Sequence, residues 1–526
     1  MKCGPRDSKN LVRGVVKFTL TACLGILLIS HAAYSVPTPT DPQKEIKKLL
    51  RQAKERLRGG QLTESEALLR KASGIDPTRS DVKVELAYVL TKQRRIVEAY
   101  EMVFEVAKAQ PTNTRALAVF GATMLAGGRF REARLLFAQA IRLNRREHLA
   151  WAGYGMVDFY ENQIGEGIAN LREAVYHEPD EPDYIFALAQ VSARAELFGE
   201  AAEAYRTFLK ISKVSDLDRR ARIRGLIDFL LYLSRSDRLY TASGKDDTRV
   251  PFVLEGNRPV LDIKVNGNLA PQRFVLDTGS GMSVISEKTA KRLKIKPVAR
   301  GGHAKGIGGD GKFEIVYGLI RQIAIGDITI RNVPVYIRRF HSDANEVDGY
   351  IGLSLISKFL TTVDYGDQSF VMTRSDEAAR TFRERGDVSL PLRLTSSGFL
   401  SGEVQIEGIS APLNFIVDTG ASVSVISDEV ARIDALSPFE STERLRVVGS
   451  AGITDDVSTY RLPRVTFGSH SRTDITAVAL NLGIINEASG FEQAGILGGN
   501  FLRNYRLTFD FKNSRVTFVP VQPEKD

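Results

Sequence analysis

The stretch FVLDTGSGMSVIS (Phe274–Ser286) recurs later in the chain as FIVDTGASVSVIS (Phe415–Ser427). In each copy, three apolar residues lead into Asp-Thr-Gly, and a second apolar run follows the turn. A lone Asp-Thr-Gly is weak evidence because Asp and Gly are common in turns, but agreement between the flanks indicates internal duplication. Asp277 and Asp418 are therefore candidates for a paired-carboxylate site, with one carboxylate from each half of the duplicated unit.

Two further segments keep the same register after the two turns, namely Tyr350-Ile351-Gly352 and Ile496-Leu497-Gly498. At these residues the chain resembles the retroviral-type aspartyl proteases, most closely in AGILGGNFL (Ala494–Leu502). The resemblance implies two all-β acid-protease barrels that meet at their Asp-Thr-Gly turns. We expect lobe 1 at residues 250–373 and lobe 2 at 388–522.

The resemblance also implies roles for the residues of both turns. Asp277 and Asp418 would be catalytic, the threonine hydroxyls would lock the turns together, and the glycines would permit a tight backbone. The supporting residues are Thr278, Gly279, Ser280, Thr419, Gly420 and Ala421. A hydroxyl at Ser280, where the second copy has Ala421, would donate to Asp277 and favour its charged form. This predicts Asp277 as the general base and Asp418 as the proton carrier.

Glycine-rich segments between the turns and the later motifs resemble the flaps that close over substrate in this family. The first half offers Gly306-Ile307-Gly308-Gly309, and the second offers Gly449-Ser450-Ala451-Gly452. The expected substrate-binding flap residues are Gly306, Ile307, Gly308, Gly309, Gly449 and Gly452.

Two neighbouring carboxylates can hydrolyse a peptide bond without a metal or a covalent nucleophile. Both cannot ionise cheaply, so one holds a proton while the other activates water. The sequence has no HExxH, no cysteine cluster, no G-x-S-x-G and no phosphate-binding loop. We therefore predict no metal and no cofactor. Five histidines lie beyond the N-terminal segment, and we regard them as surface or hydrogen-bonded residues rather than ligands: His148, His177, His303, His341 and His470.

A second repeat, with a period of 34 residues, precedes the protease-like half; Pro77, Pro111 and Pro179 mark it. Small residues hold two further repeat positions: Ala87, Gly121, Gly155 and Ala189, and Ala99, Ala133, Gly167 and Ala201. The pattern resembles tetratricopeptide (TPR) repeats, about five of them, and predicts an all-α solenoid over residues 42–240 with a capping helix near 216–236. Because such repeats are usually scaffolds, we expect a protein partner there.

The first 35 residues predict a targeting signal, because a basic stretch precedes an apolar run and small residues follow it. The segment is either cleaved, retained as a membrane anchor, or lipidated at Cys23. All three alternatives predict an exported protein, periplasmic or extracellular. Cys3 and Cys23 both lie in this segment, so the remaining chain has no disulfide and no thiol nucleophile.

Composition limits the remaining classes. The net charge of +9 is partly due to the N-terminal segment, and no dense basic run suggests nucleic-acid binding. Two polar stretches are expected to be linkers, Thr241–Thr248 before lobe 1 and Arg374–Asp387 between the lobes.

The sequence therefore predicts a multidomain exported aspartic endopeptidase that cleaves a peptide or protein substrate and recruits partners through its TPR region. Two alternatives remain. In one, the chain is a scaffold with the protease fold that binds extended peptides without cleaving them. In the other, like lobes pair between chains to form the active site.

Overall fold

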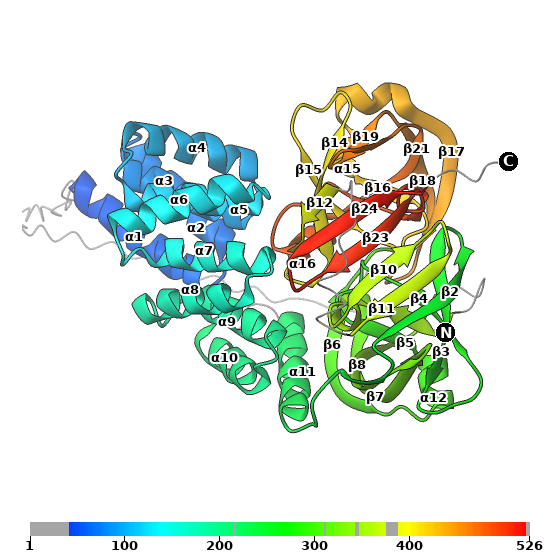
Figure 1. The fold of residues 1–526 in the computed structure, drawn as a ribbon. Helices are drawn as coiled ribbons and strands as arrows, with labels where there is room; N and C mark the ends of the chain where they lie inside the picture. Colours follow the sequence, from blue (N-terminus) through cyan, green and yellow to red (C-terminus); the bar gives the residue numbers. More distant parts are fainter. Residues whose placement is uncertain (1–40, 214–216, 310–311, 342–346, 375–387, 522–526) are drawn as a thin grey trace, which may run out of the picture.

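The computed structural model describes residues 41–213, 217–309, 312–341, 347–374 and 388–521. A helical repeat region is followed by two β-rich lobes, which lie one above the other in Figure 1. This order confirms the expected fold class, an all-α solenoid followed by two all-β lobes. The expected targeting segment and most of the second expected linker lie outside the described residues.

The repeat region consists of antiparallel helix pairs and one final helix. The pairs are α1 (Pro42–Arg58) with α2 (Leu62–Ile75), α3 (Ser80–Lys92) with α4 (Ile96–Ala109), α5 (Thr114–Ala126) with α6 (Phe130–Leu143), α7 (His148–Tyr160) with α8 (Ile164–His177), and α9 (Pro182–Arg194) with α10 (Phe198–Ile211). The final helix is α11 (Leu217–Ser234).

Small residues at the repeat positions let the paired helices approach closely. Gly155 and Gly167 face each other, and a Cβ on Gly155 would lie 3.0 Å from the Gly167 carbonyl oxygen. A Cβ on Gly121 would lie 2.7 Å from the Phe137 ring. Pro77 stands just after the end of α2, where its missing N–H and fixed φ prevent the helix from continuing.

Each lobe is built from short strands that follow the chain in the same order. Lobe 1 contains β1 (Thr241–Gly244), β2 (Asp247–Glu255), β3 (Arg258–Val265), β4 (Gln272–Leu276), β5 (Ser283–Ser286), α12 (Glu287–Arg292), β6 (Pro297–Lys305), β7 (Lys312–Ile325), β8 (Ile328–Arg338), β9 (Gly349–Ile351), α13 (Leu353–Ile356), β10 (Leu360–Asp364) and β11 (Ser369–Thr373).

Lobe 2 contains β12 (Val388–Pro391), β13 (Arg393–Leu394), β14 (Leu400–Ile406), β15 (Leu413–Val417), β16 (Ser424–Ser427), α15 (Asp428–Ala431), η1 (Asp434–Phe439), β17 (Glu440–Val448), β18 (Ile453–Leu462), β19 (Val465–Phe467), β20 (His470–Arg472), β21 (Ile475–Leu480), α16 (Gly483–Ser489), β22 (Gly495–Leu497), α17 (Gly499–Leu502), β23 (Tyr505–Asp510) and β24 (Arg515–Pro520).

The strand registers show that the lobes are duplicates. In lobe 1, β9 pairs in parallel with β4 and antiparallel with β5; in lobe 2, β22 makes the same two pairings with β15 and β16. A sheet joins the lobes, because β10 of lobe 1 pairs with β23 of lobe 2. In that pairing Thr362 lies opposite Thr508, and their hydroxyls are 2.9 Å apart.

The first expected linker is not a linker, so that prediction was wrong. Thr241–Gly244 forms β1, which pairs antiparallel with β8, and Asp247 begins β2. Thr248 is buried, and its Oγ1 accepts a hydrogen bond from the Asp327 amide at 3.0 Å. Pairing with distant strands therefore gives this polar segment its structure, which local composition did not reveal.

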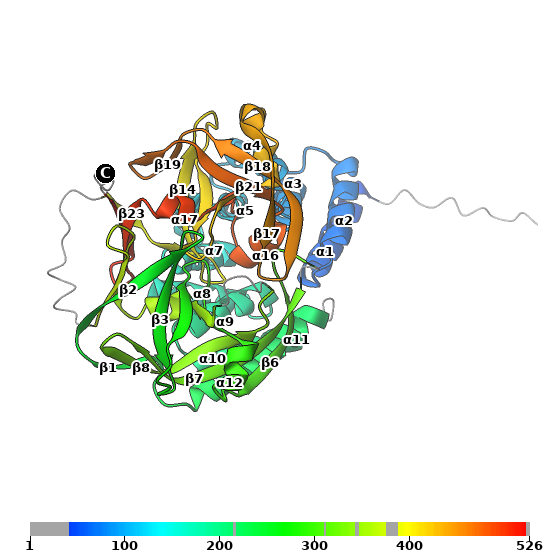
Figure 2. The ribbon, with the colours of Figure 1, turned by 90° about the vertical axis from the view of Figure 1, so that its right-hand side faces the viewer.

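The repeat region packs against both lobes, and it lies behind them in Figure 2. Against lobe 1, the Phe229 ring of α11 stacks on Tyr317 of β7 at 4.4 Å between ring centroids. Against lobe 2, the Phe130 ring of α6 meets Phe491 edge-on at 4.8 Å. The Asn162 side chain also donates to the Phe511 carbonyl at 2.9 Å. Within the described ranges, no helix is both long enough and apolar enough to span a membrane.

Candidate active site

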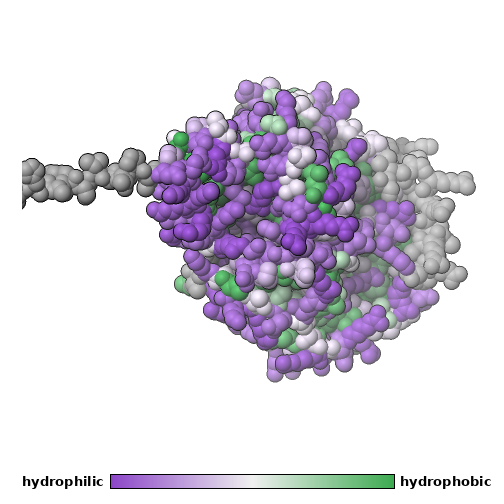
Figure 3. Space-filling model, turned by 90° about the vertical axis from the view of Figure 1, so that its left-hand side faces the viewer, coloured by the Kyte–Doolittle hydropathy of each residue, from purple (hydrophilic) through white to green (hydrophobic). Residues whose placement is uncertain are grey.

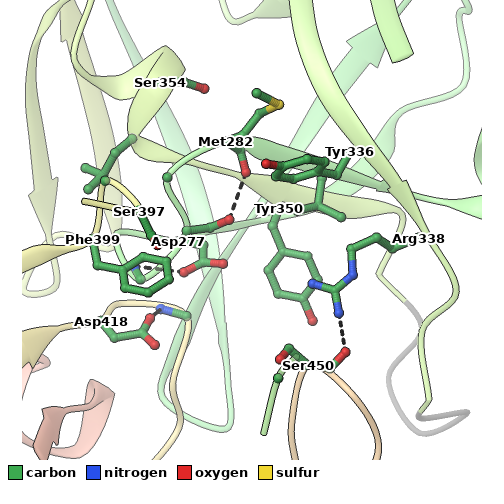
Figure 4. Close-up of a pocket in the computed structure, with 18 of the residues that line it drawn as sticks. Asp277, Met282, Tyr336, Arg338, Tyr350, Ser354, Ser397, Phe399, Asp418 and Ser450 are labelled. Carbon is green, nitrogen blue, oxygen red and sulfur yellow. Dashed lines mark hydrogen bonds between the residues drawn. The ribbon is translucent and has the colours of Figure 1, made fainter. Parts of the chain in front are cut away.

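Asp277 and Asp418 stand at corresponding places in the two lobes. Each follows a buried strand, β4 or β15, and each backbone amide donates to a later motif: Asp277 to the Ile351 carbonyl and Asp418 to the Leu497 carbonyl, both at 3.0 Å. The apolar residues before each Asp-Thr-Gly thus anchor the strand, and the polar turn emerges at the lobe interface. Figure 4 shows both aspartates in one cavity.

Thr278 and Thr419 hold the two turns together. The Thr278 hydroxyl donates to the Val417 carbonyl at 2.7 Å and accepts from the Thr419 amide at 3.1 Å. The Thr419 hydroxyl donates to the Leu276 carbonyl at 2.7 Å and accepts from the Thr278 amide at 3.1 Å. Both side chains are fully buried. The reciprocal bonds fix one aspartate relative to the other.

The two carboxyl groups are close enough to hydrogen-bond each other. Each glycine of the turns lies beside the aspartate of the opposite lobe. A Cβ on Gly420 would lie 2.6 Å from Asp277 Oδ1, and a Cβ on Gly279 would contact the Asp418 carboxyl group. A side chain at either position would therefore push the carboxyl groups apart.

The surroundings of the two aspartates differ. Burial raises the pKa of Asp277 well above its ordinary value, and the charge of Asp418 and their shared hydrogen bond raise this pKa further. Burial also raises the pKa of Asp418, but hydrogen bonds from backbone amides and from Asp277 oppose the rise. Asp418 Oδ1 accepts from Gly420 N at 2.7 Å and Ala421 N at 3.1 Å, whereas Asp277 Oδ1 accepts from Gly279 N at 3.0 Å.

These contacts oppose the roles expected from Ser280. The Ser280 hydroxyl donates to the Met282 carbonyl at 2.8 Å rather than to Asp277, so it does not favour the charged form of Asp277. Asp418, which accepts more amide donors, is the better-stabilised carboxylate. The structure therefore favours Asp277 as the protonated member of the pair, the reverse of the assignment from sequence.

Both glycine-rich segments lie at the tips of β-hairpins, β6–β7 in lobe 1 and β17–β18 in lobe 2. The tips contact each other: Ala451 N donates to the Ile307 carbonyl at 2.8 Å, and Gly309 N donates to the Ile453 carbonyl at 3.1 Å. Gly306, Gly308, Gly449 and Gly452 lie in the same contact. The structure thus brings together all six expected flap residues.

The cleft around the aspartates has a volume of about 1990 Å³ and is lined by both lobes and both hairpin tips. Helices of the repeat region line it too, through residues such as Arg194 and Phe198. Arg194 donates to the Thr395 carbonyl of lobe 2 at 2.8 Å. The repeat region thus forms part of the cleft wall, which the sequence did not predict.

Two further cleft residues were missed by the sequence analysis. Tyr350 belongs to the segment Tyr350-Ile351-Gly352, which has a counterpart in the second lobe, so the duplication could have predicted its position beside the turns. Arg338, at the end of β8, donates to the Ser450 carbonyl (Figure 4). Its guanidinium carbon lies 3.8 Å from the centroid of the Phe313 ring. No sequence signal marks Arg338. In the described part of the chain, no group of three or more His, Cys, Asp or Glu residues could hold a metal ion.

Parts of the β-rich region are similar to known proteins. A family model described as aspartyl protease matches residues 261–355 and 402–501, one segment in each lobe, and each includes an Asp-Thr-Gly turn. Among solved structures, the aspartic proteinase from Irpex lacteus is 13% identical, over 52% of this chain and 98% of its own, with a TM-score of 0.36.

The repeat region is similar to other structures. TTC0263, a TPR protein in Thermus thermophilus, is 21% identical over 35% of this chain and 98% of its own, with a TM-score of 0.30. Pseudomonas aeruginosa pilF is 16% identical over 37% of this chain and 87% of its own, with a TM-score of 0.28. A comparison with curated proteins finds no match.

Proposed function

Because both lobes match the aspartyl protease family, we propose that this chain is an exported aspartic endopeptidase whose catalytic pair is Asp277 and Asp418. The observation that carries the proposal is the hydrogen-bonded pair of half-buried carboxyl groups, one from each lobe, that line a large cleft. A pair that shares one proton has both the base and the acid that peptide hydrolysis needs.

In the proposed mechanism, ionised Asp418 takes a proton from a water molecule, whose oxygen attacks the scissile carbonyl carbon. Protonated Asp277 donates to the carbonyl oxygen as that oxygen gains negative charge. The tetrahedral species then collapses, the C–N bond breaks, and the proton held by Asp418 passes to the leaving nitrogen. Asp277 recovers a proton as the new carboxyl group forms, so the pair ends with one proton.

The cleft suits an extended peptide. A chain lying between the aspartates and the two hairpin tips can pair with exposed backbone groups while its side chains enter alternate pockets. The tips that hydrogen-bond each other would have to separate to admit the peptide and close over it, and closure would exclude water from the reacting groups.

The repeat region is proposed to recruit protein partners or substrates to this cleft. Its outer surface is mostly hydrophilic, with small separate apolar patches, so recognition there would depend largely on polar contacts (Figure 3). Part of the region is already committed to the two lobes, through Phe229 and Phe130. Export is proposed from the N-terminal sequence, and comparing the mature N-terminus with the gene sequence would test it.

Cleavage of a peptide library by the purified chain tests the activity directly. Asp277→Asn and Asp418→Asn should each lower kcat by about 100-fold or more, because each removes one half of the acid–base pair. Asp262→Asn, which alters an exposed carboxylate on β3, is the matched control and should cleave normally. Activity that survives either active-site change would refute the proposal.

The same variants address the two alternatives. A scaffold that only binds peptides would show no cleavage in the unaltered chain, yet would still bind library peptides. If like lobes paired between chains, each single variant would keep the site formed by its two unaltered lobes and would retain activity. Because Asp277 and Asp418 meet within one chain here, we expect each single variant to lose activity.

A further inference from the structure

The two sides of the cleft differ at positions that the duplication makes equivalent. In lobe 1, Ser286 of β5 pairs with Arg338 of β8; in lobe 2, the corresponding Ser427 of β16 pairs with Leu480 of β21. Arg338 and Leu480 therefore occupy the same place in the two lobes. Both line the cleft. A cation on one side of the aspartates thus faces an apolar side chain on the other.

The neighbouring positions show the same difference. Val284 pairs with Tyr336 and Tyr350, whereas Val425 pairs with Val478 and Ile496. Lobe 1 therefore presents two tyrosines where lobe 2 presents two aliphatic residues.

On the lobe 2 side these aliphatic residues belong to an apolar cluster. Val478, Leu480 and Ile496 are each less than a tenth exposed, and the flap residue Ile307 packs against the same cluster. A pocket with this lining can hold an apolar side chain, but it offers few hydrogen-bond partners to a polar side chain.

On the lobe 1 side, the described residues leave one hydrogen-bond donor of Arg338 without an acceptor. Its guanidinium donates to the Ser450 carbonyl, a neutral acceptor, and its Nε is buried without a hydrogen-bond partner among the described residues. Tyr350 lies beside Arg338 (Figure 4). Tyr350 also hydrogen-bonds Arg258, whose Nε donates to the Glu255 carbonyl at 3.3 Å. Burial lowers the pKa of Arg338, because the charged form is poorly solvated there.

Other carboxylates in the cleft are already paired with cations. Glu196 pairs with Lys358, Glu287 with Lys291, and Asp348 with Arg292. Within the described ranges, no ion pair joins a carboxylate to Arg338 or Arg258, although both feel the charge of Asp277. Among the described residues, therefore, no acidic side chain forms an ion pair that would compete with a substrate carboxylate at Arg338.

We infer that the cleft selects peptides with an acidic side chain on the lobe 1 side of the scissile bond and an apolar side chain on the lobe 2 side. The inference rests on the proposed endopeptidase function and names its substrate class. Successive side chains of an extended peptide point in opposite directions, so the two residues flanking the scissile bond reach different walls. Arg338 recognises the acidic side chain, because a charge-assisted hydrogen bond to carboxylate is stronger than the one it makes to a carbonyl.

Matched peptides test this selectivity in the full chain. The experiment compares kcat/KM for three peptides, which have Glu, Gln or Leu on one side of a cleavable bond and Leu on the other. Each peptide is made in both orders, with the variable residue before or after that bond. In the preferred order, Glu should exceed its neutral isostere Gln by about tenfold, the ratio expected for one charge-assisted bond. Equal rates for Glu and Gln in both orders, with peptides cleaved, would overturn the inference and leave the endopeptidase function intact.

Substitutions assign the preference to a residue. Arg338→Leu, which copies the equivalent lobe 2 residue, should bring the Glu/Gln ratio close to one and raise the rate on the Leu peptide relative to Glu. Arg338→Lys should retain part of the ratio. Arg331→Leu removes the same charge from an exposed position towards the other end of β8 and should leave the ratio unchanged. A Glu preference that persists in Arg338→Leu contradicts the assignment.

A binding measurement separates the two proposals. Calorimetry on Asp277→Asn should show Glu peptides binding about tenfold more tightly than Gln peptides, whether or not the chain cleaves them. Tighter Glu binding without cleavage in the unaltered chain would support the selectivity and refute the endopeptidase. Equal binding would overturn the selectivity.

Discussion

Thr278 and Thr419 each donate a hydroxyl to the strand that precedes the other, at 2.7 Å, and each accepts the other's amide at 3.1 Å. The contact lies in the interior, so water cannot replace any of the four bonds if one partner is lost.

Thr419→Val keeps the shape of the side chain but removes the hydroxyl. The Thr278 amide and the Leu276 carbonyl would lose their partners, and each buried unsatisfied group costs about 1–3 kcal/mol. We expect a lower melting temperature, which circular dichroism measures. We also expect a loss of activity, because the two aspartates would no longer be held in position relative to each other. Thr466→Val removes a hydroxyl that bonds Ser471 at the surface and should change the melting temperature little.

The pH dependence of activity should follow the shared proton. Activity needs Asp418 ionised and Asp277 protonated, so it should fall on the acid side as Asp418 gains a proton and on the alkaline side as Asp277 loses one. Because burial and the charge of Asp418 raise the pKa of Asp277, the alkaline limb should lie above the ordinary range of an aspartate. A rate profile of kcat/KM against pH measures both limbs.

The same raised pKa affects stability. In the unfolded chain Asp277 loses its proton at a lower pH than it does in the folded protein. Protonated Asp277 therefore contributes fully to the free energy of unfolding at pH values below its pKa in the unfolded chain. This contribution is lost as the pH rises through the pKa of Asp277 in the folded protein. The Asn side chain of Asp277→Asn cannot ionise. As the pH rises between the two pKa values, the melting temperature of this variant should therefore rise relative to that of the unaltered protein. A difference in melting temperature that does not vary with pH would show that Asp277 does not titrate in this way.

Ser280→Ala should leave both limbs of the activity profile in place, because the hydroxyl bonds Met282 rather than Asp277. A limb that moves to higher pH would instead show that the hydroxyl donates to Asp277 during turnover.

Contact between the hairpin tips should be sensitive to Gly308. This residue has φ +89°, and a Cβ would lie 2.6 Å from the Gly452 carbonyl carbon. Gly308→Ala should hold the tips apart and lower kcat/KM by about tenfold. This factor corresponds to a loss of about 1.4 kcal/mol in transition-state stabilisation, because the misplaced tips no longer position the substrate well. Gly267→Ala has a similar strained φ of +73° but no neighbour within 4 Å among the described residues, so it should lower stability without changing kcat/KM.

Helix α11 should support the lobe 1 hairpin through Gly225. A Cβ there would lie 2.6 Å from the Arg300 carbonyl carbon of β6, so Gly225→Ala must push the helix and the hairpin strand apart. Overpacking of this kind costs about 1–3 kcal/mol. Gly199→Ala, in α10 with no described neighbour within 4 Å, should be neutral or stabilise by up to about 1 kcal/mol. Thermal unfolding of both variants measures the difference.

Features that repeat in the sequence were predictable. The solenoid, the two lobes and their order were predicted because small residues at a 34-residue period and apolar residues around Asp-Thr-Gly are local patterns, and the fold confirms them. Both hairpin tips were found for the same reason. The catalytic roles of Asp277 and Asp418, and export, stay predictions.

Features that depend on distant contacts were not predictable. Thr241–Gly244 looked like a linker because its residues are polar, but β8 supplies the partner that makes it a strand. The direction of the Ser280 hydroxyl depends on the Met282 carbonyl, which no spacing rule identifies. Arg338 carries no motif, and only the folded register shows that it stands where lobe 2 has Leu480.

Having both lobes in one chain has a consequence for how this cleft can change. In a symmetric dimer, one mutation alters the binding site on both sides of the scissile bond at once. Here the Arg338 codon and the Leu480 codon are separate, so natural or laboratory selection can alter the preference on one side while leaving the other as it was. Selectivity on the two sides of the bond is thus set by independent mutations, a freedom that the duplication created.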